Sequence, residues 1–264
     1  AGERIDYANK TYYGAAQGTL SFTVSKAVLT DGTKDAEAEY NGDPVSLQFE
    51  LSGFVGDENF TDTVGKTEYS FKGGADADDW SETPVTVTDV AESKTVWYRF
   101  TFANYDVKYG DGLVCGEAAI VVTPAAPAAS VLCGSALNSA EGLAAGWKWI
   151  DESAEITANA AAAQAYFPLA GEDGTVGYDG WQTVAEKKGW SYNAAEKRLE
   201  CGLTLTVTHS AELLEHHDAV ASTCETAGNI EYWQCRACNG YYKDAEGKDA
   251  AVTIAAPLAP HELT

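Results

Sequence analysis

The strongest constraint on the fold is a series of short runs in which apolar and polar residues alternate between turn-forming residues. Alternation with a period of two is the pattern of a β-strand with one buried face. The clearest runs are 20–25, 45–51, 85–88 and 96–102. The turn signals between them are spaced as in a sandwich of antiparallel strands, and only 156–166 and 211–217 have a helical pattern. We therefore predict a mainly β fold.

Three similar strand endings divide the chain into segments. Phe22–Val24, Ile120–Val122 and Leu205–Val207 each close an alternating strand, and their spacing of roughly 100 and then 85 residues is the length of one immunoglobulin-sized sandwich. A proline-stiffened linker at 124–127 favours a semi-extended line of segments. We predict tandem immunoglobulin-like β-sandwiches followed by a small Cys-stapled β-ribbon module. The predicted domains are 1–26 (leader and first strand), 27–124 and 125–208 (sandwiches) and 209–264 (small Cys/His β module).

Several motifs resemble those of a known group of proteins. The segments 104–106, 110–112 and 119–124 are similar to the last strands of immunoglobulin-like MBG-type repeats of bacterial cell-surface proteins, and 146–149, 165–168 and 178–179 follow an order seen in those repeats. The tail resembles a small Cys/His surface repeat at 216–224, 227–235, Cys238 and 241–247, and 260–264 resembles the start of a further copy. The resemblance implies extracellular, non-catalytic modules in a chain that continues further.

The charge of the chain excludes some classes of partner. Forty acidic and seventeen basic residues give a formal charge of −23, which repels nucleic acid and anionic lipid surfaces. The longest weakly polar run, 118–133, is broken by prolines and is too short to cross a bilayer. The chain lacks methionine and begins as a chain would after removal of an export signal. We expect an extracellular protein, secreted or attached to the cell wall, with no membrane insertion in this segment.

The tail cysteines are the clearest candidate for a metal site. Cys235-x-x-Cys238 has the two-residue gap that lets both sulfurs face one ion, and Cys224 upstream would add a third thiolate. The fourth ligand of a structural zinc ion would be His209, because the similar repeats begin with a histidine, with His217 as the alternative nearer in sequence. A disulfide between Cys224 and one member of the pair remains equally open. Either staple is structural, because a four-ligand zinc site has no open position.

The remaining cysteines allow a second cross-link. Cys133 and Cys201 open and close the segment 125–208, and a disulfide between them would close a long loop worth about 4 kcal/mol. Cys115 occupies a position equivalent to Cys201 in the preceding segment. Three buried free thiols are the alternative, which we favour slightly.

Two further sets of side chains could bind ligands. Acidic turns at 31–35, 76–79 and 172–174 carry oxygen ligands but lack the ordered spacing of a calcium loop, so we expect solvated turns and no calcium site. Trp147, Trp149 and Trp181 could form a stacking surface for sugars, although a role in the core is the better interpretation for at least one of the first two.

No enzyme signature is present: the sequence lacks Gly-x-Ser-x-Gly, His-Glu-x-x-His, a P-loop and a Gly-x-Gly-x-x-Gly that opens a helix. Only a carboxylate pair for glycoside hydrolysis stays open as a weaker alternative. We predict a non-catalytic bacterial surface protein that acts as a stalk, adhesin segment or filament subunit. Its partners would be other surface-protein subunits or further copies, joined through the terminal run 20–25 as an added strand. The alternative function is an extracellular module that binds host or dietary glycans through exposed aromatic residues.

Overall fold

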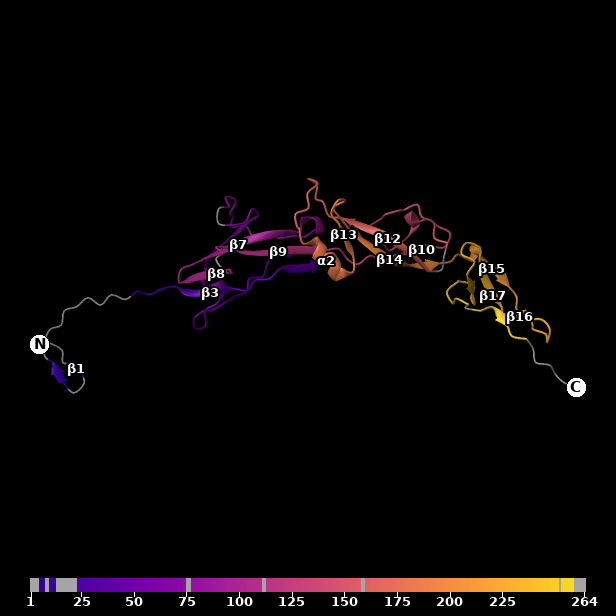
Figure 1. Ribbon diagram of the computed structural model, residues 1–264, viewed down its shortest axis with the longest axis horizontal. Helices are drawn as coiled ribbons and strands as arrows, with labels where there is room; N and C mark the ends of the chain where they lie inside the picture. The colour runs from indigo at the N-terminus through magenta and orange to yellow at the C-terminus, as the bar shows by residue number, and fades with distance from the viewer. Residues whose placement is uncertain are drawn as a thin grey trace.

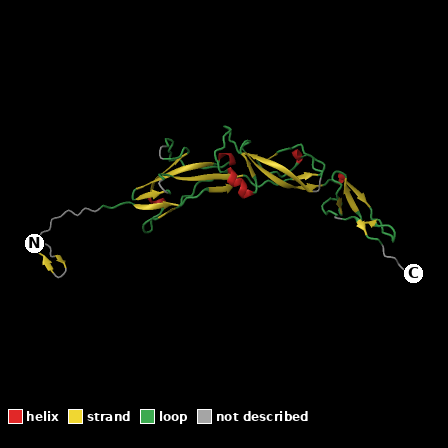
Figure 2. Cartoon of the chain, viewed as in Figure 1, coloured by secondary structure: helices red, strands yellow, loops and turns green. Residues whose placement is uncertain are grey.

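The computed structural model describes residues 5–7, 10–12, 23–74, 77–110, 113–157, 160–251 and 253–258. The chain is mainly β, as the sequence predicts, and its sheets follow one another along an extended molecule (Figures 1 and 2). We call residues 23–124 the first part, 125–208 the second part and 209–258 the tail. Most of the predicted leader and the start of the run 20–25 lie outside the described residues; within that region the structure places strands β1 (Ile5–Tyr7) and β2 (Lys10–Tyr12).

The described residues of the first part form two sheets. Their strand orders are β5-β3-β8 and β4-β9-β7-β6, in which the pairs β3–β8 and β4–β9 are parallel. The bounds are β3 (Ala27–Asp31), β4 (Ala36–Glu39), β5 (Leu51–Ser52), β6 (Val64–Ser70), β7 (Lys94–Phe102), β8 (Tyr105–Lys108) and β9 (Gly116–Thr123), with the single turns α1 (Phe60–Thr63) and η1 (Val90–Glu92).

The predicted strands of the first part form to different extents. The run 96–102 lies in β7, where Val96, Tyr98 and Phe102 are buried. The run 85–88 forms only an isolated bridge from Val87 to Val45, and the run 45–51 has this bridge and Leu51, which begins β5.

The described residues of the second part form one sheet, one α-helix and a single 3₁₀ turn. The sheet has the order β10-β14-β12-β11, with β13 also paired to β14. The bounds are β10 (Ser130–Leu132), η2 (Leu137–Ser139), β11 (Lys148–Trp149), β12 (Ala160–Pro168), α2 (Trp181–Lys188), β13 (Ser191–Asn193) and β14 (Arg198–Thr208). The β10–β14 pair is parallel and the β12–β14 pair is antiparallel.

The helix predicted at 156–166 is wrong. Residues 160–166 lie in β12, which pairs with β14 over nine residues, and Ala163 and Ala165 are buried on the sheet. This ladder and burial outweigh the helix preference of alanine. The actual helix, α2, begins after Gly180 and ends at Gly189, whose left-handed φ of 73° suits a residue without a side chain.

The first and second parts share one continuous hydrophobic core. It runs from residues such as Val87 and Val122 in the first part to Trp147 and Trp181 in the second. The Trp147 Nε1–H donates to the carbonyl of Ala125 in the linker at 2.9 Å. Side chains of α2 also form exposed ion pairs with β4. Packing therefore fixes the junction between these two parts.

Two small sheets are formed by the described residues of the tail. β15 (Leu214–His217), β17 (Tyr232–Cys235) and β18 (Tyr241–Tyr242) form one, and β16 (Gly228–Asn229) and β19 (Ala255–Ala256) form the other. The predicted helix at 211–217 is only a single 3₁₀ turn, η3 (Ala211–Leu213), which continues into β15. Among the residues described, no helix is long and apolar enough to cross a membrane.

Candidate metal centre

Four potential metal ligands converge where the tail meets the second part. They are Cys133, His209, Cys235 and Cys238, and their ligand atoms all lie within 4.8 Å of one another. Cys133 directly follows β10, and its N–H donates to the carbonyl of Thr208 at 2.8 Å. Because β10 and β14 run parallel, both strands deliver their ends, and so Cys133 and His209, to the same place.

The Cys235-x-x-Cys238 segment forms a tight knuckle. The N–H of Asn239 donates to the carbonyl of Cys235 at 2.8 Å, and the N–H of Cys235 donates to the carbonyl of Gly240 at 2.9 Å. Asn239 has a left-handed φ of 57°, which asparagine tolerates better than most residues. This turn brings the Cys238 sulfur back beside Cys235, and Gly240 N–H donates to it at 3.4 Å.

The spacing of the ligand atoms fits tetrahedral coordination. Zinc binds sulfur at about 2.3 Å and imidazole nitrogen at about 2.05 Å, so tetrahedral angles place two sulfurs about 3.8 Å apart and a sulfur and a nitrogen about 3.6 Å apart. The Cys133 and Cys235 Sγ atoms are 3.8 Å apart. Cys238 Sγ and His209 Nε2 are 3.5 Å apart. Both separations match edges of a tetrahedron around one zinc ion.

The surroundings shift the pKa values of three of the four ligands in different ways. Burial, followed by the neighbouring thiols, raises the pKa of Cys133 to about 12. Burial opposes ionisation of Cys238, but hydrogen bonds from Gly240 N–H, the Tyr242 hydroxyl and the adjacent thiols outweigh it and lower its pKa. Burial lowers the pKa of His209, which keeps the imidazole neutral and able to ligate. A divalent ion would supply the positive charge that three adjacent thiolates need.

Tyr242 and Gly247 support this group from outside. The Tyr242 hydroxyl lies 2.8 Å from His209 Nε2 and 3.7 Å from Cys238 Sγ. With Nε2 ligating a metal, this hydroxyl would donate to the Cys238 thiolate. Gly247 has a φ of 66°, and a Cβ there would stand 2.8 Å from the Cβ of His209. A glycine is therefore needed for the 244–249 turn to close over the imidazole.

Three of the four predicted ligands come together, and one does not. Cys235, Cys238 and the preferred histidine, His209, lie in the group, whereas Cys224 is exposed and outside it. Cys224 sits in a turn closed by hydrogen bonds between Thr223 and Thr226. Cys133 takes the third thiolate position, which spacing within the tail could not reveal because the residue lies 102 positions before Cys235.

The other histidines of the tail have different contacts. The alternative ligand, His217, stacks on Tyr232 with ring centroids 4.6 Å apart and lies outside the group. His216 contacts the carboxylate of Glu231 at 2.8 Å. His261 lies outside the described residues. The structure therefore brings only His209 to the cysteines among the histidines that it describes.

The candidate disulfide between Cys133 and Cys201 does not form, since both cysteines are free. Cys133 follows the pairing of Leu132 with Thr208, whereas Cys201 pairs with Ala165 seven residues earlier along β14. Seven residues of strand span about 23 Å, too far for a bridge. Cys201 and Cys115 are buried free thiols, the alternative favoured from the sequence.

Two of the three tryptophans proposed for sugar stacking are in the core. Trp147 is 5% exposed and packs edge-on against Phe167 and Trp190, and Trp181 is 1% exposed. Trp149 is partly buried against the same core. The rings of Trp147 and Trp181 therefore have no free face for a glycan.

The acidic turns are organised by local hydrogen bonds. Asp31 accepts from Thr33 N–H and the Tyr98 hydroxyl, and Asp173 accepts from the N–H and hydroxyl of Thr175. Asp76 lies outside the described residues. Within the described part of the chain, the Cys/His group is the one set of ligand atoms close enough to share an ion.

No known family model matches this sequence, and no curated protein is significantly similar to it.

Proposed function

We propose that this chain is a non-catalytic, rod-shaped segment of a secreted or wall-attached bacterial surface protein, whose modules are held in line by fixed junctions. In this proposal residues 27–124 and 125–208 are tandem immunoglobulin-like sandwiches and 209–264 is a small Cys/His module. The extended succession of sheets in Figure 1 and the strongly acidic composition support it.

The first junction is rigid because the two parts bury side chains in the same core. Val90, Val122 and Trp181, contributed by both parts, are each less than 5% exposed and belong to one cluster. Separating the parts would expose this apolar surface at roughly 25 cal/mol per Å². A spacer needs such a junction, since a flexible linker would let the modules fold back on one another.

The second junction is closed by a structural zinc ion at Cys133, His209, Cys235 and Cys238. The observation that carries this proposal is the origin of the ligands: Cys133 belongs to the second part, and the other three belong to the tail. Three thiolates and one imidazole suit zinc and fill all four positions, so no site remains for water or substrate. The ion would link the second part to the tail instead of stabilising a single module internally.

Metal analysis combined with small-angle X-ray scattering tests this function. We expect one zinc ion per chain after reconstitution and the scattering profile of an elongated particle. Removing zinc with a chelator under reducing conditions should increase flexibility between the second part and the tail. A compact particle, or a chain that binds no zinc, would contradict the proposal.

In this function the partners would be further copies of the chain or other surface subunits. Multi-angle light scattering can compare the full chain with one that lacks residues 1–26. Larger assemblies formed only by the full chain would support joining through the terminal strand. Equal monomers would restrict the chain to a stalk or adhesin segment.

A further inference from the structure

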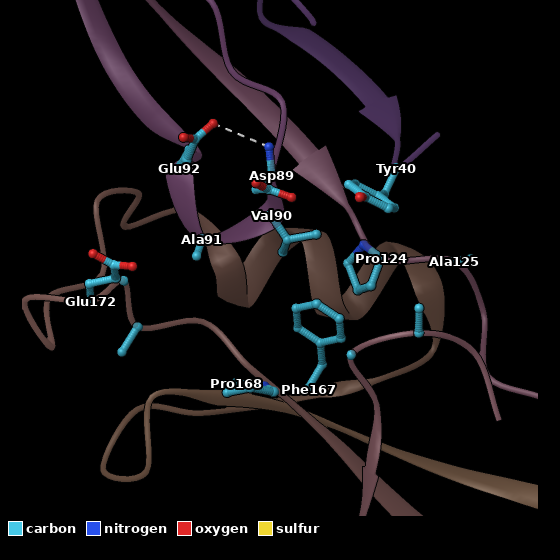
Figure 3. A pocket seen from close by; sticks show the side chains of 14 residues that line it. Tyr40, Asp89, Val90, Ala91, Glu92, Pro124, Ala125, Phe167, Pro168 and Glu172 are labelled. Carbon is cyan, nitrogen blue, oxygen red and sulfur yellow. Dashed lines mark hydrogen bonds between the residues drawn. The ribbon is translucent and has the colours of Figure 1, made fainter. Parts of the chain in front are cut away.

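A cavity lies at the junction between the first and second parts, separate from the metal centre. Its volume is about 580 Å³, within the range of small-molecule sites. Its walls come from η1, the linker after β9, the end of β12 and the turn at 170–172 (Figure 3). Any ligand bound there would contact both parts at once.

One end of the cavity is apolar and firmly supported. Figure 3 shows the rings of Tyr40, Phe167 and Pro124 around it, with Val90 beside them. Phe167 is held by an edge-on contact with Trp147, with ring centroids 5.8 Å apart. Pro124 and Val90 are buried, and Tyr40 is 44% exposed at the mouth. The aromatic faces are therefore available to a ligand without rearrangement of the core.

The cavity is also lined by three acidic residues, all of them exposed. Asp89, Glu92 and Glu172 line it, and no lysine, arginine or histidine is among the lining residues. The Glu92 carboxylate accepts hydrogen bonds from the N–H groups of Thr88 and Asp89 at 3.0 and 3.2 Å. These bonds lower the pKa of Glu92, so its negative charge is fixed in place at neutral pH.

The combination of aromatic rings and carboxylates in the cavity excludes several classes of ligand. An anion would be repelled by the carboxylates and by the net charge of −23. A bare metal ion needs clustered oxygen atoms, and these three carboxylates do not form such a group, unlike the Cys/His centre. A neutral apolar molecule would contact the aromatic rings and gain nothing from the exposed carboxylates.

We propose that the cavity binds an organic ammonium ion, with its positive charge toward Asp89, Glu92 and Glu172 and its apolar substituents against Tyr40 and Phe167. Aromatic faces attract such cations through the ring quadrupole, and the attraction strengthens when the cation is partly desolvated. Because the ligand touches both parts, its binding would also stabilise the first junction.

Choline and its neutral isostere 3,3-dimethylbutan-1-ol provide a direct test, because they differ in the charged nitrogen at nearly constant shape. We expect saturable binding of choline to the zinc-loaded full chain by calorimetry or NMR, at least about fivefold tighter than the alcohol. Tyr40→Ala and Glu172→Gln should each weaken choline binding severalfold. Both positions are exposed, so the fold should survive the changes.

Phe71→Ala is the matched control, since Phe71 is an exposed aromatic residue that does not line the cavity. It should leave choline binding unchanged. Equal affinity for choline and the alcohol, no saturable binding of choline, or variants at positions 40 and 172 that bind like the control would each overturn the proposal. None of these results would alter the zinc content of the chain, so the proposed spacer function is tested separately.

Discussion

The metal centre predicts opposite outcomes for substitutions of Cys133 and Cys224. Cys133→Ser removes one of four ligands and the only one from the second part, whereas Cys224→Ser changes an exposed cysteine outside the group. We expect the first change to weaken zinc binding at least about 100-fold, since losing even an outer-shell partner of a metal site costs up to about that much. The second change should have no effect.

The consequence for stability follows from mass action. With free zinc buffered at about 1,000 times the native dissociation constant, the ion contributes about 4.1 kcal/mol. A 100-fold weaker site at the same zinc concentration would retain about 1.4 kcal/mol, a loss of about 2.7 kcal/mol. The tail depends on this energy because the core at its base contains only three buried residues, Cys133, Cys235 and Tyr242.

Competition with a chromophoric chelator measures the affinity, and amide hydrogen exchange locates the loss of stability. In Cys133→Ser, amides of the tail should exchange faster while those of β7 and β9 stay protected. If Cys133→Ser bound zinc as tightly as the native chain, or if Cys224→Ser weakened binding to the same degree, the ligand set described here would be refuted.

Three further changes test the packing and electrostatics of the first and second parts. Hydrogen bonds from Arg99 and then Lys66 lower the pKa of Glu68 to about 2, so the stability it adds is present above its ordinary pKa of 4.5 and lost as the pH falls toward 2. In urea unfolding, the native chain should lose up to about 3 kcal/mol of stability as the pH falls from 4.5 toward 2. Glu68→Gln should not show this loss. Trp181→Ala should cost about 3–5 kcal/mol by thermal unfolding, since the side chain is 1% exposed; a loss below 1 kcal/mol would contradict its place in the core. Gly146→Ala should also destabilise the second part, because Gly146 has a φ of 85° and a Cβ there would lie 2.4 Å from the Phe167 ring; an unchanged melting temperature would argue against this contact.

The sequence predicts those features that depend on neighbouring residues. The alternation in 96–102 correctly indicates β7, and the two-residue gap between Cys235 and Cys238 correctly indicates the knuckle. Prediction fails where a distant segment decides the outcome. The alanine-rich stretch becomes β12 because β14 offers a nine-residue ladder, and Cys133 reaches the metal centre through the parallel pairing of β10 with β14.

The position of the cavity was also beyond prediction. It combines residues near the end of the first part with a strand end and a turn of the second, and only the shared core brings them together. Nothing local in the sequence marks Tyr40 and Phe167 as neighbours.

The parallel pairing of β10 with β14 determines how the second part responds to mechanical tension. A force applied along the molecule would act on the second part at the linker before β10 and at His209 after β14. These two points lie at opposite ends of the parallel ladder. Force in this direction shears the paired residues 130–132 and 206–208 together, whereas a hairpin pulled open at one end would release its bonds one at a time. The ligands Cys133 and His209 immediately follow the two strands. An ion bound by them would therefore bear part of the applied force.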